Sequence, residues 1–143
     1  MNAKTLHYYR NARKAGHPAQ GALERARFLA EFYDGEDPDG WHSFLGGRVK
    51  AGLVEDSEGF DIEDFEEGTQ KILRRKLESG EWSVFGAVAH IYNEDGRITD
   101  KYAGSLWGLV GRWNDPDFLD CVFDAAEEAV RMVQAEAYEV LPL

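Results

Sequence analysis

The sequence contains a single cysteine, Cys121, among 143 residues. One thiol cannot form an internal disulfide, so we expect the fold to be held by its core alone. Leu119 and Val122 lie close to this cysteine in an apolar stretch, which predicts a buried and unreactive thiol. A chain without internal disulfides is typical of the reducing cytoplasm, and this is the compartment that we predict.

Long apolar runs are missing as well. No 18 consecutive apolar residues occur, and the N-terminus lacks the uninterrupted apolar stretch of a secretory signal peptide. The sequence therefore predicts no contact with a membrane. Hydrophobic residues make up 43% of the chain and aromatic residues 13%, which is enough for a core. Because compact domains are typically about 100 to 150 residues long, we expect residues 1–143 to form a single domain.

The motifs that catalysis or phosphate binding requires are also absent. No G-x-x-x-x-G-K-[ST] or G-x-G-x-x-G loop is present. Ser105 stands in a Gly-Ser-Leu-Trp-Gly segment that resembles a nucleophile elbow, but Ala103 and Trp107 occupy the positions where that motif needs glycine. We predict no catalytic residue and no cofactor, and a hydrolase outside these templates is the third functional alternative.

Metal-binding patterns fail in the same way. No H-E-x-x-H pair occurs, and the acidic segments 34–40 and 56–64 lack the ligand spacing of an EF-hand loop. We therefore predict no metal site. The histidines considered in this prediction are His7, His17, His42 and His90.

Positive charge is scarce and unevenly placed. The net charge is −11, yet residues 1–32 carry six Lys or Arg against two Glu, and residues 33–70 carry twelve Asp or Glu against two Lys or Arg. We therefore divide the predicted domain into a basic helical hairpin, 1–33, and an acidic α+β body, 34–143. Such a body repels nucleic acids and anionic lipids within about a Debye length and attracts basic proteins, so direct nucleic-acid binding is not expected.

The sequence does contain a clear succession of helix and strand patterns. Apolar residues at helical spacing, with Thr5, Pro18 and the pair Asp115-Pro116 at helix starts, predict four helices. Apolar runs bounded by Gly and Asp predict strands, and segment 82–92 is apolar on both faces, so it should lie inside the sheet. The predicted helices are 5–15, 18–33, 61–79 and one beginning at Asp115, and the predicted strands are 48–54, 82–92 and one or two within 97–111.

This order, αα-β-α-ββ-α, predicts an α+β fold. An N-terminal helical hairpin would precede a small antiparallel sheet of three to four strands, because the turn at residues 93–96 makes its flanking strands antiparallel. The long C-terminal helix would pack on this sheet. Residues 34–40 are rich in Gly, Pro and Asp and are predicted to form a loop.

Carboxylates gather in two places. Eight fall within the thirteen residues 55–67, and others lie at the start of the last helix. Each group on its own is typical of a solvated helix start, because carboxylates stabilise the first turn. Together they would imitate the phosphates of a nucleic acid and bind the basic surface of a host protein or nucleoprotein complex. The predicted partner-binding residues are Glu55, Asp56, Glu58, Asp61, Glu63, Asp64, Glu66, Glu67, Asp117 and Asp120.

A basic surface is the alternative. Arg10, Arg13 and Lys14 fall on one face of the first predicted helix, beside Tyr8 and Tyr9. Basic and aromatic residues together are typical of nucleic-acid contacts, which would make the protein a regulatory or nucleic-acid-associated factor. These cations can equally match the protein's own acidic surface, and the net charge of −11 favours that structural interpretation.

Two segments resemble proteins of mobile elements. Residues 8–17, with Ala-Leu at 22–23 and Ala-Arg at 26–27, and the Ser-Leu-Trp-Gly at 105–108 ahead of an acidic last helix, look like small uncharacterised acidic proteins encoded by phages and other mobile elements. Such proteins include anti-CRISPR and antirestriction inhibitors of host defence nucleases. The resemblance implies a non-enzymatic inhibitor of a host nucleic-acid-handling defence complex, acting in the host-cell cytoplasm, and it carries over no residue role.

Overall fold

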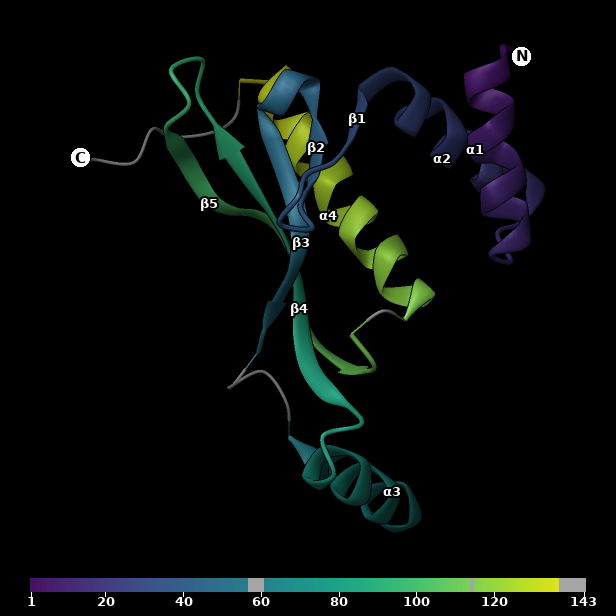
Figure 1. Ribbon diagram of the computed structural model, residues 1–143, viewed down its shortest axis with the longest axis vertical. Helices are drawn as coiled ribbons and strands as arrows, with labels where there is room; N and C mark the ends of the chain where they lie inside the picture. Colours follow the sequence, from purple (N-terminus) through teal and green to yellow (C-terminus); the bar gives the residue numbers. More distant parts are fainter. Residues whose placement is uncertain (57–60, 114, 137–143) are drawn as a thin grey trace.

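A computed structural model describes residues 1–56, 61–113 and 115–136 (Figure 1). The helices are α1 (Ala3–Lys14), α2 (Ala19–Phe32), α3 (Glu67–Glu78) and α4 (Pro116–Gln134). The strands are β1 (Tyr33–Glu36), β2 (His42–Phe44), β3 (Val49–Glu55), β4 (Ser83–Tyr92) and β5 (Ile98–Gly111), and two short 3₁₀ turns are η1 (Leu45–Gly47) and η2 (Ile62–Asp64). Within these segments no helix combines the length and the apolarity needed to cross a bilayer.

The strands form one antiparallel sheet in the order β1-β2-β3-β4-β5. The predicted α+β class is confirmed, with a helical pair first, then the sheet, then a C-terminal helix. β4 pairs with β3 on one side and β5 on the other, so the strand predicted to lie inside the sheet does so. The turn between β4 and β5 has Gly96 at φ 80°, in the left-handed region that glycine adopts without strain.

The described part of the sheet has five strands rather than three to four, and the order is αα-βββ-α-ββ-α. The segment expected to be a loop after the second helix forms the β1–β2 hairpin, with Tyr33 opposite Phe44. Asp37 closes its turn, because one carboxylate oxygen accepts the backbone N–H groups of Asp39 and Trp41, both at 2.9 Å. Asp and Gly residues therefore mark the turn correctly, but the aromatic residues on either side add two short strands.

Two helix starts also differ from the prediction. The helix expected from residue 61 begins at Glu67, because η2 and the extended Phe65 come first. Asn2 rather than Thr5 caps α1, and its side chain accepts the Thr5 N–H at 2.8 Å. The start of α4 is as predicted, since the Asp115 carboxylate accepts the Asp117 N–H at 3.0 Å and Pro116 fills the first turn.

The core lies between α4 and one face of the sheet. α4 runs diagonally across the sheet in Figure 1. Its inner stripe is made largely of small residues, which let the helix approach the strands closely. The fully or nearly fully buried residues at this contact are Val49, Ala51, Ala87, Ala89 and Ile91 of the strands and Val122, Ala125, Ala126, Ala129 and Val130 of α4.

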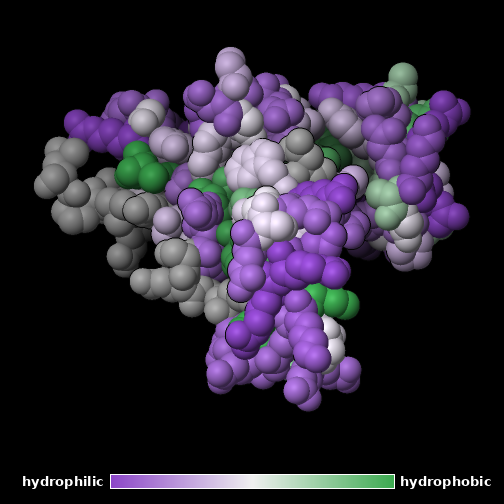
Figure 2. Space-filling view, turned by 60° about the horizontal axis from the view of Figure 1, so that its bottom comes forward, coloured by the Kyte–Doolittle hydropathy of each residue, from purple (hydrophilic) through white to green (hydrophobic). Residues whose placement is uncertain are grey.

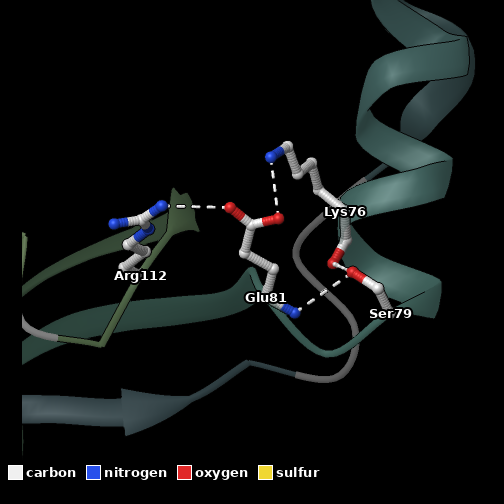
Figure 3. A network of polar contacts seen from close by, with 4 residues as sticks. All are labelled: Lys76, Ser79, Glu81 and Arg112. Carbon is white, nitrogen blue, oxygen red and sulfur yellow. Dashed lines mark hydrogen bonds and ion pairs between the residues drawn. The ribbon is translucent and has the colours of Figure 1, made fainter.

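α3 lies away from these layers, at the lower end of the view in Figure 1. Leu73 is its one buried residue, and Figure 2 shows the protruding end of the molecule as mostly hydrophilic. Glu81 connects this arm to the sheet: its carboxylate accepts from Lys76 Nζ at 2.7 Å and from Arg112 Nη2 at 3.0 Å (Figure 3). The two cations hold the pKa of Glu81 below its usual range.

Candidate functional site

The structure divides the predicted acidic surface into two groups. Asp56 accepts the backbone N–H of Gly108 at 2.9 Å and so fastens the end of β3 to β5. Asp61 accepts the N–H of Glu63 at 2.9 Å, and Asp120 lies 3.0 Å from His17 Nε2. These three carboxylates therefore have partners within the protein. Glu58 lies outside the described residues.

The other predicted carboxylates are exposed. Within the described segments none of them forms an ion pair, since the five salt bridges found there involve other acidic residues. They surround η2, the start of α3, the end of β3 and the first turn of α4, and they are Glu55, Glu63, Asp64, Glu66, Glu67 and Asp117.

The alternative basic residues, Arg10, Arg13 and Lys14, are exposed on the last turns of α1. Arg13 Nη1 donates to the carbonyl of His17 at 3.2 Å, which ties it to the α1–α2 turn. Contacts between the helical hairpin and carboxylates of the acidic body do occur, as expected, but they involve residues other than Arg10, Arg13 and Lys14. Arg25 of α2 pairs with Asp124, and His17 pairs with Asp120, both on α4.

The next candidates are the Cys121 thiol and the side chains that could bind a metal ion. Cys121 is half-buried, and burial, followed by the nearby Asp124, raises the pKa of its thiol, which favours the unreactive protonated form. Among the residues that the structure describes, no three His, Cys, Asp or Glu side chains are grouped so that they could hold a metal ion.

A cavity of about 420 Å³ lies beside β3, a size typical of ligand sites. It is bounded by the β1–β2 turn on one side and by the first turns of α4 on the other. We call it the β3 groove. Its apolar wall consists of Trp41, Leu53, Trp113, Phe118, Leu119 and Val122, and its acidic rim consists of Glu36, Asp39 and Asp115.

Two apolar residues of this wall are open to solvent. Trp113 is 56% exposed and Leu119 is 40% exposed, although Leu119 follows the helical spacing of the buried residues of α4. Trp41 lies against Gly52, where a Cβ atom would stand 2.8 Å from the indole ring, so this glycine permits the close contact. Exposed apolar surface beside polar groups is typical of binding sites.

The groove runs along an open edge of the sheet. The N–H of Asp56 donates to the Val84 carbonyl at 3.0 Å, and the N–H of Tyr92 donates to the Arg48 carbonyl at 2.8 Å. Backbone groups alternate in direction along an antiparallel strand, so even-numbered residues of β3 bond to β4 and odd-numbered residues point the opposite way. β2 covers only positions 49 to 51. Leu53 and Glu55 therefore present their N–H and C=O groups to an edge with no neighbouring strand in the described structure.

His42 also lines the groove. Its Nδ1 lies 2.7 Å from the hydroxyl of Tyr33, and its ring packs edge-on against Phe123. Burial lowers the pKa of His42, with the carboxylates of Glu36 and Asp37 opposing that shift. Burial also raises the pKa of Tyr33 to about 12. Both groups are therefore neutral near pH 7.

No protein-family model, curated protein or solved structure matches the chain. A functional proposal therefore rests on the geometry of the β3 groove and on the distribution of charge.

Sequence reasoning did not find this groove. Of its acidic rim, Glu36 and Asp39 were assigned to a loop, and Asp115 was interpreted as the cap of the last helix, at the start of the second acidic cluster, but not as one of the partner-binding residues. No local pattern signalled the groove, because Leu119 follows the helical spacing of the buried residues of α4 and its 40% exposure is decided by the fold.

Proposed function

We propose that the protein is a non-enzymatic binding module whose carboxylates engage a basic surface of another protein. The observation that carries this proposal is the β3 groove, in which an apolar wall is bordered by Glu36, Asp39 and Asp115. A rim of carboxylates around an apolar surface favours cationic partners and repels anionic ones. The net charge of −11 extends the same preference over the whole surface.

The partner that this charge fits best is a host protein or nucleoprotein complex that handles nucleic acids. Such proteins carry basic surfaces shaped to hold phosphates. The exposed carboxylates of residues 63–67 would occupy that surface in place of a nucleic acid, and the resemblance to phage-encoded inhibitors implies the same mode of action. Arg25 of the helical hairpin pairs with Asp124 of α4, and His17 lies 3.0 Å from Asp120, which supports a structural role for the basic hairpin.

The test uses the heparin-binding proteins of a bacterial lysate, because heparin retains proteins with phosphate-binding surfaces. The immobilised protein should capture a subset of them. Added double-stranded DNA should release that subset by competing for the same basic surface, and added salt should release it by screening the exposed charges. One exposed ion pair contributes only about 0.2 to 1 kcal/mol, so charges must be changed in groups.

Three variants, each shown to unfold at the wild-type temperature, locate the surface. Glu36 and Asp39 changed together to Lys alter the rim, and Glu63, Asp64, Glu66 and Glu67 changed together to Lys alter the 63–67 segment. Both should reduce capture strongly. Arg10, Arg13 and Lys14 changed together to Ala should leave it nearly intact. Unchanged capture by both acidic variants, or loss of capture only in the hairpin variant, would overturn the proposal in favour of the basic hairpin.

A further inference from the structure

We infer that the β3 groove binds an extended basic segment of the partner as an additional strand on the open edge of β3. The inference rests on the proposed function for the charge of the partner. The mode of binding, strand addition, is inferred separately from the backbone geometry of β3.

The open edge offers a regular set of backbone groups. Leu53 and Glu55 are two residues apart and point their N–H and C=O groups to the same side. A strand rises about 3.3 Å per residue, so an extended peptide presents its own groups at the matching interval. Recognition by strand addition uses such edges, with backbone hydrogen bonds for affinity and alternate side-chain pockets for specificity.

The side-chain environment selects the sequence of the added strand. A residue placed opposite Leu53 directs its side chain to the same face of the sheet as Leu53, which is the face that α4 covers. There it would meet Phe118, Leu119 and Val122, so an apolar side chain fits. Covering the 40% exposed Leu119 removes apolar surface from water.

The rim determines the charge of the flanking residues. Glu36 and Asp39 come from the β1–β2 turn, and Asp115, one of whose oxygens caps α4 through the Asp117 N–H, comes from the start of α4, so carboxylates line the groove from both elements. Lysine or arginine beside the apolar residue would reach them. A second copy of this chain is disfavoured as the occupant, because two such rims would repel each other, and the phosphates of a nucleic acid would be repelled in the same way.

The probe is a displayed library of random linear peptides, selected on the full-length protein, followed by synthesis of the enriched sequences. Enriched peptides should place Lys or Arg beside an apolar residue. In NMR-detected hydrogen exchange, a bound peptide should slow exchange of the Leu53 and Glu55 amides most among those of β3, because these are the amides that face the open edge. N-methylation of every second residue removes the N–H groups on one side of the peptide. Of the two possible methylation patterns, only the one that removes the N–H groups facing β3 should abolish binding.

A matched pair of substitutions tests the edge directly. Glu55→Pro removes the outward N–H and leaves the β3–β4 ladder intact, since the ladder does not use this N–H. Glu55→Gln removes the charge but keeps the N–H. We expect about a tenfold or greater loss of peptide affinity for Glu55→Pro and about a twofold loss or less for Glu55→Gln, with both proteins folded.

The outcomes separate the inference from the proposed function. Basic peptides that bind without protecting Leu53 and Glu55, and without sensitivity to Glu55→Pro, would overturn strand addition while the proposed function stands. Acidic or neutral peptides that bind at this edge would overturn the proposed function and the basic segment inferred here. An absence of enriched peptides, or a dimer of this chain that Glu55→Pro dissociates in sedimentation, would overturn the inference.

Discussion

Tyr33 and His42 face each other across the β1–β2 hairpin, and His42 also lines the β3 groove. The Tyr33 hydroxyl and His42 Nδ1 are 2.7 Å apart, and Phe44 and Phe123 pack against the tyrosine ring. Burial disfavours the charged form of each group, which is why the pKa of His42 is lowered and that of Tyr33 is raised. The pair is thus built to remain neutral.

The His42 pKa leads to a prediction about acid stability. Because the folded protein binds this proton less readily than the unfolded chain, the stabilisation is complete above the ordinary histidine pKa of about 6.5 and is lost as the pH falls through the lowered, folded-state value. The free energy of unfolding from urea titrations should therefore decrease from pH 7 toward pH 5. In His42→Gln this part of the decrease should be absent.

Tyr33→Phe is the matched control, because it removes only the hydroxyl. It should retain the acid-side decrease that His42 causes. It should also be less sensitive to alkali than the wild type, since the raised pKa of Tyr33, about 12, makes the wild type lose stability as the pH rises beyond about 10. Identical acid limbs for wild type and His42→Gln would contradict this account of the buried pair.

At the scale of elements, the contact between α4 and the sheet depends on small residues. Gly104 lies on β5 beneath α4, and a Cβ atom there would overlap the backbone carbonyl of Ala125. Gly86 lies on β4 beneath the ring of Trp107, on the opposite face. The first neighbour is helix backbone fixed by its own hydrogen bonds, whereas the second is a side chain that is 40% exposed.

This difference predicts unequal costs for the same substitution. Gly104→Ala must displace α4 from the sheet and should reduce the free energy of unfolding by about 2 to 3 kcal/mol. Gly86→Ala should cost about 1 kcal/mol, because Trp107 can rotate outward. Denaturant midpoints at constant slope measure both. If Gly86→Ala were the more damaging of the two, the close approach of α4 would not be what limits packing here.

Sequence patterns served well for elements with local signals. Asp115 and Pro116 define the start of α4, and the turn ending at Gly96 defines the β4–β5 hairpin, because cap and turn preferences depend on neighbouring residues. They served poorly for β1 and β2, which are short and acquire their stability from packing on Phe28 and Phe123. Such short strands have no reliable periodicity.

At the scale of the whole molecule, the α1–α2 helical hairpin is attached to the body through an ion pair whose two side chains are buried to very different extents. The Arg25 side chain is only 9% exposed and lies over the ring of Phe123, whereas its partner Asp124 is 68% exposed. One guanidinium nitrogen of Arg25, Nη1, is buried without a hydrogen-bond partner among the described residues. The desolvated side of this pair is therefore the cation.

The uneven burial predicts an uneven response to mutation. Asp124→Asn leaves a desolvated guanidinium without its anion and should cost about 1 to 3 kcal/mol of unfolding free energy. Arg25→Met keeps much of the packing on Phe123 and leaves a carboxylate that water can solvate, so it should cost less. The double variant should be no less stable than Asp124→Asn alone. A larger loss in Arg25→Met, measured by urea unfolding, would contradict this assignment.

The amino-acid sequence by itself determined two kinds of feature. The local ones are the four helices and the paired strands β4 and β5, and the global ones are the α+β class and the acidic charge. Spacing, capping and composition encode these features, because each depends on near neighbours or on the whole chain. Only the tertiary structure decided which carboxylates remain available. Asp56 meets the Gly108 amide from 52 positions away, and Arg25 meets Asp124 from 99 positions away. The β3 groove likewise joins the β1–β2 turn to the start of α4, and no local pattern contains a contact between segments that meet only after the sheet has formed.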